Sequence, residues 1–376
     1  MSYPRRTFLR HAATLAGGAL LPTGASAQSE VRSFTLSAAP ARIALLGDPH
    51  PATAAWAYDG QSPGPEIRVR QGERVRIVVA NRLPEETTVH WHGLRVPNAM
   101  DGVPHLTQPP IAPGGQFVYE FDAVDAGTFW YHPHSRTYEQ VARGLYGAFI
   151  VEERAPIAVD REATWVLADW RLTQDAQVRA DFRTMFDVAH AGRIGNTVTV
   201  NGVVPESFDV RAGERVRLRL VNAAAARIFG LRFERHTPVV IALDGQPVAP
   251  HAPAGGRIVL GPGERTDIVI DMRGAPGEKF AVADDFYPRS PFRLLDLAYA
   301  STRPVREQPL PAFSGLPGNP IPEPNLDRAV RHTIVFAGGA MGGMGGMGGM
   351  GGMGGMGGMG GMGPGGMLWI PFHTAV

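Results

Sequence analysis

The feature of this sequence that most restricts its fold is an internal repeat of short alternating segments. Residues 68–83 read RVRQGERVRIVVANRL and residues 209–224 read DVRAGERVRLRLVNAA, so Gly72 and Gly213 stand at matching positions. In both copies apolar and polar residues alternate on either side of a Gly-Glu pair, the pattern of half-buried β-strands joined by a tight turn. The sequence therefore predicts two related β-rich units in tandem.

A second pair of matching segments supports this duplication. Residues 112–115 (APGG) precede an alternating run over 117–121, and residues 261–264 (GPGE) precede a similar run over 268–272. Many short strands separated by Pro and Gly turns are typical of β-sandwiches. We therefore expect an all-β chain with two consecutive β-sandwich domains. Helix signals are sparse, and the two short candidates are residues 174–182 and 138–143.

The rest of the chain divides by composition. Residues 304–326 are rich in proline and favour an extended linker, and residues 331–336 look like one more strand. The predicted parts are a signal peptide over 1–27, the first sandwich over 31–153, the second over 154–300, a Pro-rich linker over 301–330, and a remnant of a third domain with a low-complexity tail over 331–376.

The amino-terminal segment has the composition of an export signal. Arg5 and Arg6 precede a short apolar run and a small-residue stretch that ends at Ala27. Two arginines before Phe-Leu resemble the signal of the twin-arginine export machinery, whereas an ordinary secretory signal with two chance arginines is the alternative. The apolar run is too short to span a bilayer. We expect an exported, periplasmic protein without a membrane span.

Methionine recurs at every third position from Met341 to Met362, separated by glycine pairs. Such a glycine-rich run cannot offset its loss of backbone entropy and is predicted to be disordered. Two interpretations stay open. The soft thioether sulfurs could capture Cu(I), or the run could be a flexible linker.

Two histidine pairs in the first unit carry the predicted chemistry. They are His90-Trp91-His92 and His132-Pro133-His134. Residues i and i+2 of a strand project to the same face, so each pair presents two imidazoles to one side. Neutral imidazoles suit copper, zinc, iron and nickel. The sequence therefore predicts a metal site formed by His90, His92, His132 and His134.

Composition narrows the possibilities further. The chain contains no cysteine, which excludes disulfides, thiol nucleophiles, thiolate zinc sites and cysteine-ligated blue copper. A net charge of +1 argues against a nucleic-acid partner. The repeat places Leu231 and Phe233 where His90 and His92 stand in the first unit. The second unit is therefore interpreted as a scaffold without ligands.

Several motifs of the first unit resemble those of a known family. They are Trp56-Ala-Tyr-Asp-Gly60, His90-Trp-His-Gly-Leu94, Trp130-Tyr-His-Pro-His134 and Gly144-Leu-Tyr-Gly147. They are similar to the first cupredoxin domain of multicopper oxidases, the laccase-like and periplasmic copper-resistance enzymes. This resemblance implies two cupredoxin-like Greek-key β-sandwiches followed by a truncated third. It also implies copper as the cofactor, with O2 and a small reducing substrate, Cu(I) or a phenol, as reactants.

The resemblance also implies roles for the site residues. His90 would ligate the type 2 copper, and His92, His132 and His134 would ligate the type 3 pair. Asp101 matches an acidic residue that helps to deliver protons to the cluster. The alternative for Asp101 is a turn residue before Gly102.

The sequence departs from the family pattern at its carboxyl end. Neither the H-P-x-H-x-H motif nor the H-C-H motif of a third domain is present, so the type 1 copper site and half of the cluster histidines are missing. We expect a truncated and inactive oxidase. An exported protein that binds or sequesters copper in copper resistance, through the histidine pairs and the Met-rich tail, is the alternative. A copper-free structural relative is the third hypothesis.

Overall fold

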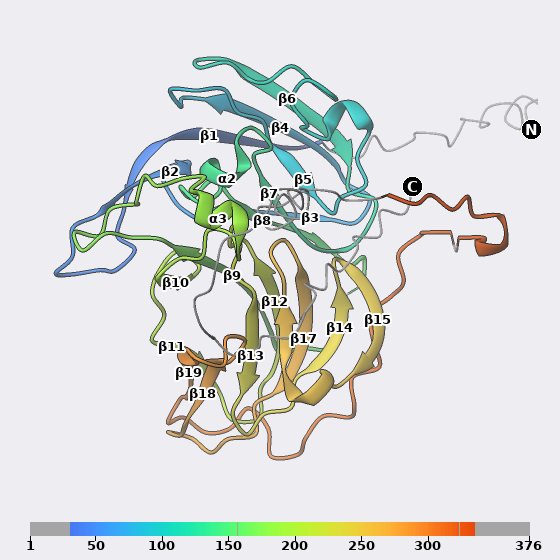
Figure 1. The fold of residues 1–376 in the computed structure, drawn as a ribbon. Helices are drawn as coiled ribbons and strands as arrows, with labels where there is room; N and C mark the ends of the chain where they lie inside the picture. Colours follow the sequence, from blue (N-terminus) through green and yellow to red (C-terminus); the bar gives the residue numbers. More distant parts are fainter. Residues whose placement is uncertain (1–30, 156, 323, 335–376) are drawn as a thin grey trace, which may run out of the picture. The chain divides into compact units, whose positions relative to one another are not determined.

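The computed structural model describes residues 31–155, 157–322 and 324–334, which are mainly β-strands (Figure 1). The predicted signal peptide and the Met-Gly-Gly run lie outside the described residues, as does all but the start of the predicted third-domain remnant. Within the described part, no helix is both long enough and apolar enough to cross a membrane.

The first β-sandwich consists of two four-stranded sheets. Their strand orders are β2-β1-β4-β6 and β3-β8-β7-β5. The strands are β1 (Arg32–Ile43), β2 (Thr53–Tyr58), β3 (Gly64–Arg70), β4 (Arg74–Asn81), β5 (His90–His92), β6 (Gln116–Asp122), β7 (Gly127–His132) and β8 (Gly147–Glu152).

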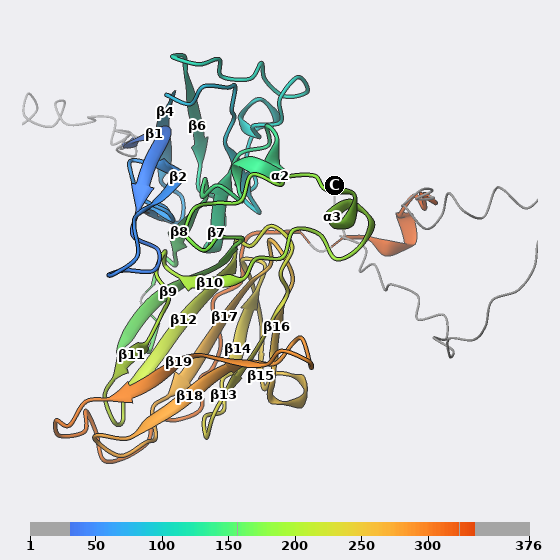
Figure 2. The ribbon, with the colours of Figure 1, turned by 60° about the vertical axis from the view of Figure 1, so that its left-hand side comes forward.

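The second β-sandwich repeats this order and adds strands at its edges. Its sheets run β10-β9-β12-β17-β14-β15 and β11-β19-β18-β13-β16, and Figure 2 shows β9, β12 and β17 in succession. The strands are β9 (Arg161–Trp170), β10 (Thr197–Val200), β11 (Ser207–Val210), β12 (Arg215–Asn222), β13 (Phe229–Phe233), β14 (Val239–Leu243), β15 (Gln246–His251), β16 (Ile258–Leu260), β17 (Arg265–Asp271), β18 (Lys279–Asp284) and β19 (Phe292–Tyr299). The prediction of an all-β chain with two consecutive sandwiches is confirmed.

The helices are few and short, and one predicted helix is wrong. They are α2 (Thr137–Gln140), α3 (Met185–Ala189) and the 3-10 turns η1 (Asn98–Met100), η2 (Ala254–Gly256) and η3 (Leu326–Arg328). The helix expected over 138–143 is reduced to α2 and the turn after it. Residues 174–182 form no helix, because Thr173 closes a loop by bonding to the backbone of Gln177 and the chain pairs Leu172 with Val178.

The predicted strand over 331–336 is not formed in its described part. Residues 331–334 have no strand assignment and pair with no other segment among the described residues. A β-strand depends on hydrogen bonds to a neighbour, so alternation alone does not produce one. The Pro-rich segment before it is extended and is held to both sandwiches. Asn319 bonds to the backbone of Ala126 and to the side chain of Gln246.

The repeated strands β4 and β12 bury different amounts of their polar faces. In β4, Val75, Ile77 and Val79 are buried while the alternate residues are partly exposed, which is the predicted half-buried pattern. In β12 every residue is buried, including Arg217 and Arg219, which are both 0% exposed. The prediction that β12 is half-buried is therefore wrong, because its polar face is covered by the first sandwich.

A network of ion pairs compensates the positive charges of these buried arginines. Asp267 on β17 accepts hydrogen bonds from Arg217 Nη2 at 2.6 Å and from Arg219 Nη1 at 3.2 Å. It also accepts one from the Thr128 hydroxyl on β7, so the network joins the two sandwiches. Burial alone would raise the pKa of Glu162, but attraction to Arg219 and the other arginines around it lowers this pKa to about 2. The Glu162 carboxylate is therefore ionised and paired with Arg219 at neutral pH.

Removing Asp267 tests this network. The variant Asp267→Ala leaves two buried arginines with less compensation, and we expect the free energy of unfolding to fall by about 3–5 kcal/mol. Urea unfolding followed by tryptophan fluorescence measures the loss. The control is Asp285→Ala, whose partner Arg232 is half-exposed, with an expected cost below about 1 kcal/mol. Equal losses in the two variants would show that burial of the network adds nothing.

Candidate metal centre

The pairing of β5 with β7 brings the two histidine pairs together. The strands are antiparallel, with His90 opposite His132 and Trp91 opposite Tyr131. Trp91 and Tyr131 are fully buried in the core of the first sandwich. Because side chains alternate along a strand, burial of these two rings directs His90, His92 and His132 to the other face of the sheet.

The four predicted ligands form one group. Ring nitrogens of His90, His132 and His134 all lie within 4.8 Å of one another. His92 extends the group, since its Nδ1 lies 3.2 Å from His132 Nε2. The rings of His90 and His134 are 4.2 Å apart between centroids. His134 follows the end of β7, and its backbone N–H donates to the Thr88 hydroxyl.

Backbone carbonyls orient two of the rings. His90 Nδ1 lies 2.8 Å from the carbonyl oxygen of Asp101, and His132 Nδ1 lies 3.1 Å from that of Pro133. A carbonyl only accepts, so each Nδ1 carries the proton and each Nε2 is free to bind a metal ion. His92 differs, because it is Nδ1 that faces His132.

Three of the four histidines, His92, His132 and His134, are neutral at physiological pH. Burial, followed by the positive charge of Arg265, lowers the pKa of His92 far below its usual range. Burial also lowers the pKa of His132, and it lowers that of His134 to about 4. Neutral imidazole is the form that binds metal ions, so protons do not compete for the site near pH 7.

The spacing of the nitrogens suits a shared metal ion. Two imidazole nitrogens, each about 2.0 Å from one ion at a tetrahedral angle, lie about 3.3 Å apart. This value is close to the 3.2 Å between His92 Nδ1 and His132 Nε2. Copper, zinc and nickel all accept imidazole ligands, and the residues therefore fit a transition-metal site.

Asp101 lies at the His90 end of the group. It follows η1, and one oxygen of its carboxylate is 3.3 Å from His90 Nδ1. The hydrogen bond from His90 is the main cause that lowers the pKa of Asp101, so the carboxylate is ionised at neutral pH. Its side chain is 34% exposed, so it also reaches solvent.

Three residues at the site were not singled out from the sequence. The indole of Trp130 stacks on the His132 ring, with centroids 4.1 Å apart. Gly263 of the second sandwich lies against His92, because a β-carbon there would be 3.1 Å from His92 Cε1. Arg265 follows two residues later. The motif around Trp130 was interpreted only as a resemblance, and Gly263 only as part of the repeated turn at residues 261–264. No local pattern marks Arg265.

The matching registers of the second sandwich hold other residues. There β13 and β18 take the places of β5 and β7 in the sheet order. Leu231 stands opposite Asp284, and Phe233 opposite Val282, where the first sandwich has His90 with His132 and His92 with Trp130. These positions provide no imidazole.

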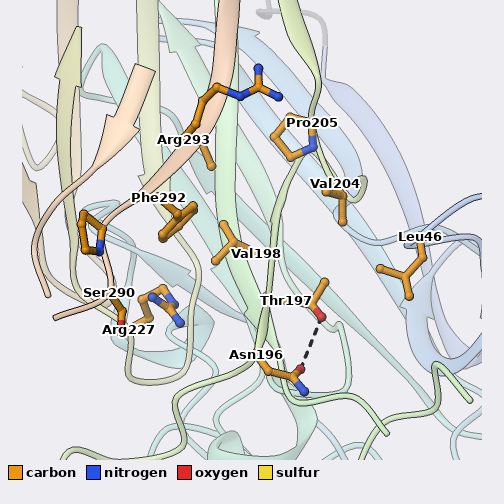
Figure 3. Close-up of a pocket in the computed structure, with 12 residues that line it drawn as sticks. Leu46, Asn196, Thr197, Val198, Val204, Pro205, Arg227, Ser290, Phe292 and Arg293 are labelled. Carbon is orange, nitrogen blue, oxygen red and sulfur yellow. Dashed lines mark hydrogen bonds between the residues drawn. The ribbon is translucent and has the colours of Figure 1, made fainter. Parts of the chain in front are cut away.

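The cavity shown in Figure 3 is separate from the histidines. It encloses about 660 Å³ and is lined mainly by residues around β10 and the start of β19, including Thr197, Arg227 and Phe292. Asn196 and Thr197 bond to each other at its wall. None of the four histidines lines it, so the cavity is not the metal centre.

Comparison with known proteins identifies the family. Two models described as "Multicopper oxidase" match residues 42–156 and 161–294. Together they cover most of the chain, which therefore belongs to the multicopper oxidase family.

Relatives with this fold include copper-resistance proteins and solved oxidases. Copper resistance protein A of Escherichia coli is 30% identical over 81% of this chain and 59% of its own. A multi-copper oxidase from Pseudomonas thermotolerans has a TM-score of 0.73 and 37% identity, covering 80% of this chain and 70% of its own. The blue copper oxidase from Nitrosomonas europaea has a TM-score of 0.64 and 29% identity, covering 76% and 93%. The chain spans about half to three fifths of the length of three such curated relatives.

Substitution at Gly102 tests how Asp101 is held against His90. Gly102 has φ +77°, and a β-carbon there would overlap the Val89 carbonyl at the entry to β5. The variant Gly102→Ala should therefore displace the Asp101 carbonyl and weaken metal binding at His90. Gly114→Ala is a matched control, because Gly114 also has φ +77° but open space around it.

The two variants share the same backbone strain, about 1–2 kcal/mol. Unfolding by urea should therefore show a larger loss for Gly102→Ala than for Gly114→Ala. Titration with Cu(II), followed by its visible absorption, should show weaker binding in Gly102→Ala alone. Equal binding by both variants would contradict the role assigned to this contact.

Proposed function

We propose that this chain binds copper through His90, His92, His132 and His134 as one half of the oxygen-reducing copper cluster of multicopper oxidases. His90 would hold the type 2 ion, and the other three would hold the type 3 pair. Copper bound there supplies the one-electron chemistry that reduces O2 to water in this family. The 3.2 Å separation of His92 Nδ1 and His132 Nε2 is the observation that carries the proposal.

The chain's own residues prepare the site. The carbonyls of Asp101 and Pro133 keep His90 Nε2 and His132 Nε2 unprotonated. We propose that the Asp101 carboxylate, ionised and partly exposed, relays protons from solvent to the site beside His90 and releases them readily. Trp130 covers one face of His132 and limits the access of water to that ring.

Electron entry is the part that this sequence lacks. A type 1 copper site takes a cysteine thiolate as ligand, and the chain has no cysteine. The second sandwich offers no imidazole at the matching registers, so a second copy of the chain cannot complete the cluster there. The proposed activity, oxidation of Cu(I) or a phenol by O2, needs a cysteine that this sequence does not contain, so we expect the chain alone to be inactive.

An exported protein that binds or sequesters copper is the second candidate. The absence of a thiolate, together with the retained histidine group, favours binding without turnover. The methionines of residues 341–362 would add soft ligands for Cu(I). Both candidates use the same four histidines and differ in whether the chain takes part in an oxidase.

Copper content and oxygen uptake distinguish these possibilities. We expect purified protein loaded with copper to retain at least about one ion per chain and to lack the intense charge-transfer band of a copper thiolate. Oxygen consumption with Cu(I) or a phenol should stay at background. His132→Ala should lose most of the bound copper, because His132 lies next to His92 and also belongs to the cluster with His90 and His134.

His236→Ala is the matched control, because His236 is a partly buried histidine of the second sandwich that bonds to Glu234 and Tyr299. It should retain the copper. A chain that binds no copper would support a copper-free relative instead. Oxygen uptake well above background would show that the chain is active without a thiolate.

We also propose export through the twin-arginine machinery to the periplasm, on the basis of Arg5, Arg6 and the segment that ends at Ala27. The double variant Arg5→Lys, Arg6→Lys should keep the protein in the cytoplasm, because this machinery requires the arginine pair. Fractionation of cells and immunoblotting measure its distribution. Unchanged export of the double variant would indicate an ordinary secretory signal.

A further inference from the structure

Arg265 places an unusual buried cation next to the histidine group. It lies on β17 of the second sandwich, and its side chain is only 4% exposed. Its guanidinium donates to the carbonyls of Gly263 and Asp244 at 2.8 and 2.9 Å, and to that of Thr128 on β7 at 3.3 Å. Backbone oxygens therefore satisfy most of its donors without cancelling its charge.

The nearest carboxylate to Arg265 is largely in water. Asp244 lies 3.2 Å from Arg265 Nη1, but its side chain is 57% exposed. Solvent screens such a pair strongly. Arg217 and Arg219 differ, since Asp267, Glu153 and Glu162 surround them. Asp267 and Glu264 also attract Arg265 at longer range, but burial outweighs them and lowers the pKa of Arg265. Of these three arginines, Arg265 therefore has the fewest ion-pair partners.

Contacts on both sides fix this cation beside His92. Gly93 follows His92 with φ +87°, and a β-carbon there would overlap Arg265 Nη2. Gly263, whose carbonyl accepts from Arg265, packs against His92 from the other side. The charge of Arg265 also contributes to the lowered pKa of both His92 and His132.

The two ends of the histidine group therefore carry opposite charges. The Asp101 carboxylate lies 3.3 Å from His90 at one end, and Arg265 adjoins His92 at the other. A fixed positive charge repels a divalent ion twice as strongly as a monovalent one. The end formed by His92 and His132 should thus disfavour Cu(II) relative to Cu(I), whereas the end formed by His90 should favour Cu(II).

We propose that Arg265 is an electrostatic positioning residue that biases the His92–His132 pair toward monovalent copper. It acts through the field at the pair without touching the metal. The second sandwich, which offers no ligand at the registers of the histidines, would thereby set which oxidation state the first one holds. This inference rests on the proposed copper binding by the four histidines.

The affinities of the holoprotein for Cu(I) and Cu(II) test the proposal. Removing the charge in Arg265→Met should tighten Cu(II) binding relative to Cu(I) on the order of tenfold, as expected for one unit charge across about 10 Å in protein. A tenfold change in this ratio equals about 59 mV in the one-electron potential. Competition with chelators, performed without oxygen for Cu(I), measures both affinities.

Three further variants separate the charge from the fold. Arg265→Lys keeps the charge and should leave the ratio near the wild-type value, even if the changed hydrogen bonds weaken both affinities. Arg232→Met removes a half-exposed arginine of the same sandwich and should change nothing. His132→Ala loses most of the copper of the site, so the copper that it still binds lies elsewhere, and adding Arg265→Met to it should leave the affinity ratio of this remaining copper unchanged. This excludes a contribution from the methionine-rich segment.

The outcomes distinguish this inference from the function on which it rests. If the wild-type protein binds no copper, the proposed function fails. If it binds copper and Arg265→Met changes both affinities equally, Arg265 is a structural residue and the electrostatic proposal is overturned. If Arg265→Lys shifts the ratio as much as Arg265→Met does, loss of hydrogen bonds rather than charge is responsible, and the proposal is likewise wrong.

Discussion

The candidate metal centre depends on buried ion pairs of the second sandwich at the face that meets the first. Asp267 binds Arg217, Arg219 and the Thr128 hydroxyl at once. Thr128 lies on β7, the strand that ends at His132. The ion pairs of Arg217 and Arg219 with buried carboxylates depend on well-defined geometry, so this interface admits little sliding. The strand that ends at His132 is thus held to the second sandwich through Thr128. The second sandwich therefore positions the histidines although its matching registers hold no imidazole.

The second sandwich shows that this arrangement of strands forms without the metal-binding histidines. In the second sandwich β13 and β18 occupy the places of β5 and β7, with Leu231 and Asp284 at the registers of His90 and His132. Asp284 is buried, which raises its pKa, and it accepts hydrogen bonds from the backbone of Gly230 and Phe286. The same arrangement of strands therefore accommodates a carboxyl group, which accepts backbone hydrogen bonds, where the first sandwich has an imidazole. The first sandwich should accordingly fold before it acquires copper.

The sequence could predict those parts of the structure that follow from local periodicity. The alternation in His90-Trp91-His92 places the histidines on one face because Trp91 fills the core on the other. Contacts between the sandwiches have no such signature. Arg217 alternates with apolar residues as a solvent-facing arginine would, yet it is fully buried. Arg265 contacts Thr128 on β7, and because the two residues are far apart in the sequence, no local pattern predicts this contact. The helix expected over residues 174–182 failed because a side-chain bond from Thr173 closed a loop instead.

The histidines are arranged in advance of metal binding, and this arrangement has an energetic consequence. Carbonyls of Asp101 and Pro133 hold the rings of His90 and His132, Trp130 stacks on the His132 ring, and His92 Nδ1 already lies 3.2 Å from His132 Nε2. A ligand set that is ordered beforehand loses little side-chain entropy when a metal ion binds. Most of the binding energy is then available to distinguish one ion from another. In such a rigid site the fixed charges decide the outcome, since the rings cannot move to relieve repulsion. A carboxylate at one end and a guanidinium at the other therefore make two positions, a few ångströms apart, unequal for the same metal.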